Sequence, residues 1–128
     1  MFLGLRTVIY PAPDLDAAKK WWSELLGIEP YFDEPFFVGF SPGGYELGLD
    51  PNADPAAGPR TYWGVRNIEE ASSKLIVLGS TPDEIVSEVG DGIKIGTFRS
   101  PSGDIVGVIE NPVFELAPVE ASGEGTGL

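Results

Sequence analysis

The side chains that could do chemistry in this sequence are tyrosines, carboxylates and arginines, because its 128 residues include no histidine and no cysteine. The missing histidine removes the commonest general base and transition-metal ligand, and the missing cysteine removes thiol catalysis and disulfides. Arg60 or Arg99 remains able to stabilise a developing anion, and Tyr62, Tyr10 or a carboxylate to move a proton. No acid and base stand clustered in the sequence, so these residues favour ligand binding over catalysis.

Arg60 has two interpretations. Its planar guanidinium could hold a carboxylate or phosphate of a ligand through two parallel hydrogen bonds, or it could pair with one of the 20 acidic side chains of the protein itself. By the two-residue period of a strand, Tyr62 lies on the same face as Arg60, and Trp63 lies on the opposite face. Trp63 is therefore expected in the core or in a contact between subunits.

A short sequence motif occurs twice, at 41–49 and 100–108, with Ser, Pro and two Gly at the same positions of each copy. Each copy predicts a turn followed by a strand, since Pro fixes φ and Gly accepts positive φ. Gly48 and Gly107 fall opposite the apolar face of their strands, where they would leave two gaps without side chains. The simpler alternative is that each glycine marks a bulge or a close backbone contact, but their matched placement favours a shared role.

Capping residues and apolar periodicity predict the elements that must position these groups. Asp14 and Asn67 are expected to cap the N-termini of two helices, and Gly27 and Gly79 to stop them. Apolar residues recur at helical spacing in both, including Leu78 in the second. The expected helices are 14–26 and 67–78, and the expected strands are 3–10, 29–32, 35–40, 45–50, 60–66, 83–89, 93–99 and 104–110.

The same order of elements, βαβββ, thus occurs twice, at about 3–51 and about 60–112, with a linker at 52–59. One module alone has too few strands to bury both of its faces. The sequence therefore predicts an α+β fold in which two tandem βαβββ modules form a curved mixed sheet with a concave cleft. We expect one domain over 1–112, and a flexible, Gly-rich acidic tail over 113–128.

The charge of the chain limits its partners. Eight basic and 20 acidic residues give a net charge of −12, which would repel nucleic acid and anionic membrane surfaces and attract cationic ligands, although acidity also serves solubility alone. No basic leader precedes an apolar run, and no apolar stretch reaches about 18 residues. A cytoplasmic protein without nucleic-acid or membrane partners is expected.

The duplicated pattern resembles the vicinal oxygen chelate superfamily, which includes glyoxalase I, extradiol dioxygenases, methylmalonyl-CoA epimerase and the bleomycin-resistance proteins. The resemblance covers roughly residues 3–112, and it implies a glyoxalase-like fold and, for a short member, a homodimer. The residues that carry it are Leu5-Arg6-Thr7-Val8-Ile9 with Asp14-Leu15, Trp21-Trp22 with Leu25-Leu26-Gly27, Val65 with Asn67, and Ser100-Pro101-Ser102-Gly103 before Val106-Gly107-Val108.

In metal-dependent members of that superfamily, four inward-facing positions hold a divalent ion, usually with two His or Gln and two Glu. The resemblance places these positions on Thr7, Gly48, Arg60 and Gly107. Two glycines, a hydroxyl and a guanidinium cannot bind a cation, so no metal or other cofactor is expected. A site made only of carboxylates would suit Mg²⁺ or Ca²⁺ alone. The carboxylates available for one are Glu46, Asp50 and Glu110.

With those ligands replaced, the resemblance implies a hollow for a small molecule. The first hypothesis is a metal-free protein, similar to the bleomycin-resistance branch, that sequesters an apolar or cationic organic ligand. The alternatives are a metal-independent enzyme (a lyase, an isomerase or a relative of the dioxygenases) and a regulatory module whose cleft takes a partner segment. The expected ligand-binding residues are Thr7, Ile9, Gly48, Arg60, Tyr62, Arg99 and Gly107, with apolar walls from 36–40 and 62–63.

Overall fold

The computed structural model describes residues 2–114, which form an eight-stranded sheet and two α-helices. Each half has the element order βαβββ, so the predicted α+β fold is confirmed. The strands are β1 (Gly4–Pro11), β2 (Phe32–Glu34), β3 (Phe37–Phe40), β4 (Glu46–Asp50), β5 (Arg60–Gly64), β6 (Thr81–Gly90), β7 (Ile93–Arg99) and β8 (Ile105–Glu110). The helices are α1 (Leu15–Leu26) and α2 (Ile68–Val77), and two 3₁₀ turns, η1 (Pro42–Gly44) and η2 (Pro55–Ala57), precede β4 and β5.

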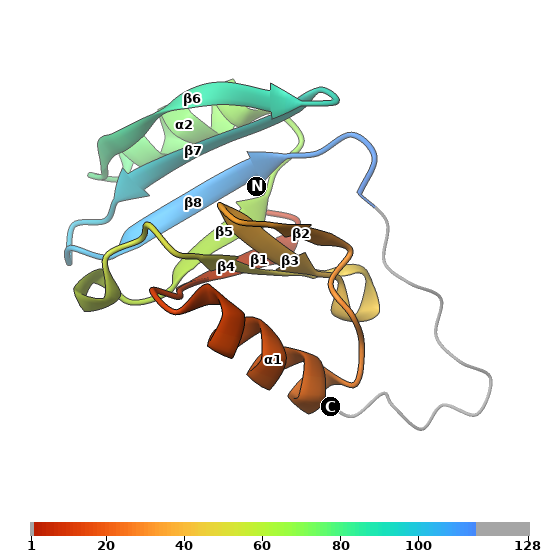
Figure 1. The fold of residues 1–128 in the computed structure, drawn as a ribbon. Helices are drawn as coiled ribbons and strands as arrows, with labels where there is room; N and C mark the ends of the chain where they lie inside the picture. The colour runs from red at the N-terminus through yellow and green to blue at the C-terminus, as the bar shows by residue number, and fades with distance from the viewer. Residues whose placement is uncertain (1, 115–128) are drawn as a thin grey trace.

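The sheet is mixed, with the strand order β2-β3-β4-β1-β5-β8-β7-β6. In each half the first and last strands pair in parallel, β1 with β4 and β5 with β8, and the halves join where β1 runs antiparallel to β5. Figure 1 shows a curved, open sheet with α1 against the first half and α2 against the second. The inner faces of both halves therefore contribute to one surface.

Both helices begin at the capping residues that the sequence predicts. The Asp14 carboxylate accepts a hydrogen bond from the N–H of Ala17 at 3.1 Å, and the Asn67 side chain accepts one from the N–H of Glu70 at 3.0 Å. These bonds satisfy donors that have no partner inside the helix. Helix α1 ends at Gly27, whose φ of 71° lies in the left-handed region that glycine adopts without strain.

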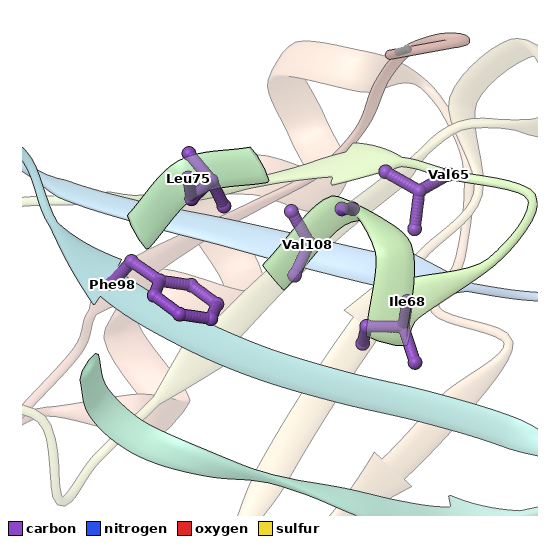
Figure 2. Close-up of a cluster of buried hydrophobic side chains, with 6 residues drawn as sticks. Val65, Ile68, Leu75, Phe98 and Val108 are labelled. Carbon is purple, nitrogen blue, oxygen red and sulfur yellow. The ribbon is translucent and has the colours of Figure 1, made fainter. Parts of the chain in front are cut away.

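The apolar core lies on the outer face of the sheet, beneath the helices. Figure 2 shows its second half, in which side chains from α2 meet those of the sheet; the buried residues are Val65, Ile68, Ala71, Leu75, Phe98 and Val108. The corresponding core beneath α1 is formed by Ala12, Val38, Phe40 and Leu49, with Trp22 packed against it. Since α1 and α2 both cover the outer face, neither helix covers the inner face of the sheet.

Several bounds differ from the prediction by one to three residues, and two of the differences have a clear consequence. A strand was expected at 29–32, but β2 begins at the end of that range, because Pro30 has no N–H for a strand ladder. The N–H of Tyr31 makes the first bond to β3, donating to the Gly39 carbonyl oxygen at 2.9 Å. Helix α2 also ends one residue early, so Leu78 is 61% exposed where the apolar stripe predicted a buried side chain.

The chain turns after β8 and runs back toward the first half. Asn111 makes this turn, because its side-chain oxygen accepts from the N–H of Val113 at 3.0 Å and its carbonyl oxygen from that of Phe114 at 3.3 Å. The Phe114 ring then lies 6.2 Å from the ring of Tyr45, measured between centroids. The flexible tail expected at 113–128 lies outside the described residues from position 115 onward.

Candidate functional site

The inner face of the sheet carries a cavity of ≈ 940 Å³, called the inner cavity below. Its lining is mostly apolar, which is the usual character of a small-molecule site. The sheet contributes Ile9, Ile93, Ile95 and Ile109, and the first half adds an aromatic wall of Tyr31, Phe32, Phe36 and Phe37. Two charged side chains border the cavity, Arg6 and Glu46.

The Glu46 carboxylate accepts hydrogen bonds from both neighbouring hydroxyls. Thr7 lies opposite Glu46 in the parallel β1–β4 pairing and donates to Oε1 at 3.3 Å, while the Tyr31 hydroxyl donates to Oε2. Burial, followed by this hydrogen bond and the charge of Glu46, raises the pKa of Tyr31, so Tyr31 stays a neutral donor at neutral pH. Within residues 2–114 no lysine or arginine pairs with Glu46, whose carboxylate can therefore accept from a ligand.

Arg6 reaches the inner cavity through a β-bulge. Between the pairs Leu5–Trp63 and Thr7–Tyr62, β1 advances two residues while β5 advances one, so Arg6 is the extra residue. A bulge of this kind turns the extra side chain toward the face of its neighbour, and Arg6 and Thr7 both line the cavity. The Arg6 guanidinium carbon lies 4.0 Å from the centroid of the Phe114 ring, which is a cation–π contact.

Three of the residues expected in the site do line the inner cavity: Thr7, Ile9 and Tyr62. Tyr62 is 4% exposed, and burial raises the pKa of its hydroxyl. It also borders a second hollow of ≈ 470 Å³ toward β6. Tyr62 is therefore a wall of the site that stays protonated at neutral pH.

Arg60 and Arg99 do not border the inner cavity and pair with carboxylates of the protein instead. Arg60 contacts Glu84 at 3.3 Å and Asp50 at 3.7 Å. Arg99 contacts Asp83 at 3.8 Å and donates to the Gly103 carbonyl oxygen at 2.8 Å. Of the two interpretations of Arg60, the geometry matches the internal ion pair.

The gaps expected beside Gly48 and Gly107 are filled by aromatic rings. A Cβ built on Gly48 would collide with the ring of Phe37, whose Cε1 would lie 3.0 Å away. A Cβ on Gly107 would stand 2.5 Å from Tyr62 Cδ1. Neither glycine borders the inner cavity, because the two rings cover them. The close-contact alternative for these glycines therefore describes the structure, and the prediction of open gaps was wrong.

No protein-family model and no curated protein matches this sequence, whereas solved structures do. A glyoxalase/bleomycin resistance protein/dioxygenase superfamily member from Vibrio splendidus 12B01 is 16% identical, with a TM-score of 0.65 over 84% of this chain and 99% of that chain. Methylmalonyl-CoA epimerase from Streptomyces coelicolor is 14% identical, with a TM-score of 0.68 over 92% of this chain and 100% of that chain. The chain has the vicinal oxygen chelate fold.

This fold is also that of the Mn(II)-bound glyoxalase from Novosphingobium aromaticivorans, which is 20% identical with a TM-score of 0.74. The match covers 97% of this chain and 44% of that longer chain. Identities this low establish the shared fold and leave the chemistry of the site to be argued from its own residues. The resemblance predicted from the sequence is thus confirmed as a resemblance of fold.

The vicinal oxygen chelate fold implies a metal site, and the residues here do not fit one. Of the four positions that the sequence resemblance assigns to metal ligands, Gly48 and Gly107 have no side chain and are covered by rings, and Arg60 is a cation held by two carboxylates. Thr7 alone offers an oxygen, which already donates its proton to Glu46. Those positions thus supply one ligand where a divalent cation needs several.

The carboxylates near the site do not replace the missing ligands. Asp50 pairs with Arg60, and Glu110 accepts a hydrogen bond at 2.8 Å from the N–H of Ile68 at the start of α2. Glu46 stands apart from both with its two hydroxyl partners. Across residues 2–114 no three His, Cys, Asp or Glu side chains come together as a metal site.

The structure also brings residues to the inner cavity that sequence reasoning did not select. Strict alternation along the expected strand 3–10 would place Arg6 on the opposite face from Thr7, away from the site. Tyr31 was placed in a strand without a role, and Phe114 fell in the expected tail. Tyr31 could have been found from its position on the same face as Glu46, but that position follows only from the register of β2, β3 and β4.

Proposed function

We propose that this protein is a metal-free small-molecule-binding protein of the glyoxalase/bleomycin-resistance type, which sequesters an apolar or cationic organic ligand in the inner cavity. The observation that carries the proposal is the cavity itself: ≈ 940 Å³, mostly apolar, and walled on one side by four aromatic rings. This volume falls within the range of about 300 to 1,000 Å³ that is typical of small-molecule sites. Flat organic molecules pack well against such rings.

A cationic group of the ligand would meet Glu46. The carboxylate has two hydroxyl donors and no basic side chain among the described residues, and it retains acceptor capacity. The net charge of −12 adds a long-range attraction for cations. We therefore place an apolar body of the ligand against the isoleucines and aromatic rings, and any cationic group at Glu46.

The test is binding of simple probes to protein treated with EDTA. Naphthalene-2-methanol (neutral) and 2-naphthylmethylammonium (cationic) should each bind with one site per chain by calorimetry, with and without EDTA. The variant Ile95→Trp places a large ring inside the cavity and should weaken both probes at least tenfold. Its matched control is Ile76→Trp, at a half-exposed position of α2 outside the cavity. Binding of neither probe, or equal binding by both variants, would reject the proposed site.

A metal-independent enzyme is the second candidate, and the hydrogen bond between Tyr31 and Glu46 favours it. A carboxylate joined to a neutral hydroxyl inside a cavity can accept and return a proton, and the guanidinium of Arg6 borders the same cavity. Prolonged incubation followed by mass spectrometry separates the two functions. Recovery of the organic ligand unchanged supports sequestration; turnover that survives EDTA and disappears in Glu46→Gln establishes the enzyme.

We also propose that two copies of the chain pair in solution, as the resemblance to short members of the superfamily implies. Trp21 and Leu25 are 57% and 59% exposed, one turn apart on α1, and offer apolar surface for such a contact. Sedimentation velocity should give the mass of a dimer for the natural chain, and that of a monomer for Trp21→Glu if α1 forms the interface.

Neither described helix has the length and apolar character needed to cross a membrane.

A further inference from the structure

Arg6 is a half-buried cation at the edge of the inner cavity, with no anionic partner among the described residues. Within residues 2–114 it forms no ion pair, and none of the side-chain hydrogen bonds uses its N–H groups. A guanidinium has five such donors and no acceptor. Among the described residues, no fully buried side-chain nitrogen or oxygen lacks a partner, so the N–H groups of Arg6 open to the cavity or to solvent.

The side chain of Arg6 is also held in place. Its stem crosses Gly64, where a Cβ would stand 3.0 Å from Arg6 Cγ and 2.7 Å from Nε, so only a glycine leaves room for it. A terminal nitrogen lies over Gly4 in the same way, 3.2 Å from a Cβ placed there. The Phe114 ring covers the guanidinium from the other side at 4.0 Å. Two glycines, a bulge and a ring thus fix one cation at the cavity edge.

We propose that Arg6 is the binding residue for an acidic group of the ligand, so that the ligand is a planar organic acid. This inference rests on the apolar site of the proposed function and adds an acidic group to its ligand: the apolar body lies in the inner cavity, a carboxylate or comparable oxyanion pairs with Arg6, and Glu46 receives any donor or cationic group. A fixed guanidinium matches a carboxylate with two parallel hydrogen bonds. Its fixed position also reduces the entropy lost on binding.

Because the protein as a whole is negatively charged, its affinity for an acidic ligand depends on Arg6. With a net charge of −12 the chain repels anions, and two other arginines, Arg60 and Arg99, are already paired with carboxylates away from the cavity. Arg6 is the basic side chain that borders the cavity. An acidic ligand therefore depends on this residue, and its removal should abolish the preference for an acid while leaving the apolar site intact.

The experiment compares two probes that share one ring system. The probes are 2-naphthoate, which carries a carboxylate, and naphthalene-2-methanol, which is neutral, each titrated by calorimetry into the full chain. The natural protein should bind 2-naphthoate at least about tenfold more tightly than the alcohol, the lower end of what a charge-assisted pair contributes. Arg6→Met should remove this preference and change the affinity for the alcohol less than about twofold. Arg6→Lys should keep part of it, since the charge remains but the planar fork is lost.

Arg66→Met is the matched control. It removes the same charge from an exposed position outside the cavity, and the preference for 2-naphthoate should persist. Equal binding of the two probes by the natural protein, or an unchanged preference in Arg6→Met, would overturn this inference while the proposed function stands. Failure of the natural protein to bind either probe would instead overturn the proposed function and the inference with it. Retained binding of the alcohol shows that Arg6→Met is folded.

Discussion

Replacing Gly107 by alanine should destabilise the protein strongly. An ideal Cβ at this position would stand 2.5 Å from the backbone oxygen of Thr61 and 2.5 Å from Tyr62 Cδ1, where ordinary contacts begin at 3.4 Å. The Thr61 oxygen cannot turn aside, because Thr61 is paired in β5 directly beside β8. The two strands must therefore separate by several tenths of an ångström, and overpacking of this kind costs about 1 to 3 kcal/mol.

Gly48→Ala is the matched control, since Gly48 occupies the equivalent position in the first half. Its new methyl group would meet the tip of the Phe37 ring and, at 3.3 Å, Ile9 Cγ1, but no backbone atom is among its nearest neighbours. Phe37 borders the inner cavity, so its ring has space to turn into. Alanine also reduces the conformational entropy of the unfolded chain, which offsets part of the strain. We expect Gly48→Ala to stay within about 1 kcal/mol of the natural protein.

Urea and thermal unfolding followed by circular dichroism measure both variants. For Gly107→Ala we expect a loss of about 2 kcal/mol, which for a domain of this size corresponds to a melting temperature lower by roughly 6 to 10 °C. Gly48→Ala should instead weaken naphthalene-2-methanol binding, because the displaced Phe37 ring enters the cavity. A Gly107→Ala protein that melts within about 2 °C of the natural protein, or a Gly48→Ala protein that loses as much stability as Gly107→Ala, would contradict the predicted backbone clash.

Three further predictions concern a cap, an ion pair and a titration. Asn67→Ala removes the hydrogen bond to the N–H of Glu70 and should lower the free energy of unfolding by about 1 kcal/mol in urea titrations, with Asn67→Asp as the conservative control. Arg60→Met breaks partly exposed ion pairs, so it should change the free energy of unfolding by less than about 1 kcal/mol. The same variant should bind naphthalene-2-methanol and 2-naphthoate as the natural protein does; weaker binding would show that Arg60 belongs to the ligand site. The pKa of Tyr31 is raised in the folded state, so its stabilising effect is complete below the ordinary tyrosine pKa of about 10 and is lost as the pH rises above that value. Stability measured by urea unfolding should therefore fall above about pH 10, and less steeply in Tyr31→Phe; equal slopes would contradict the assignment.

The helices and the duplicated order of strands were predictable because local chemistry decides them. Asp14 and Asn67 cap helices in the structure as their positions before apolar stripes predict, and Gly27 ends α1. Alternating apolar residues located seven of the eight strands to within a few residues. The exception is β2, a three-residue edge strand whose bounds depend on pairing with β3 rather than on its own pattern.

The site was less predictable, because pairing between distant strands determines it. Strict alternation along β1 assigns Arg6 and Thr7 to opposite faces, and only the register against β5 reveals the bulge that brings both to the cavity. The gaps expected at Gly48 and Gly107 likewise required knowledge of neighbouring side chains. Phe37 and Tyr62 lie on adjacent strands and cover them, which no property of the glycines themselves indicates.

Because of the bulge in β1, the charge that lines the cavity depends on the number of residues in the first part of this strand. Deleting the single residue Leu5 would remove the surplus position, pair Arg6 with Trp63 and direct the guanidinium to the outer face beside the helices. Gly48, Thr7 and the core residues under α1 would keep their partners. Deleting one codon at a position that does not itself line the cavity would thus leave Glu46 as the charged side chain of the cavity, the same result that Arg6→Met gives from within it.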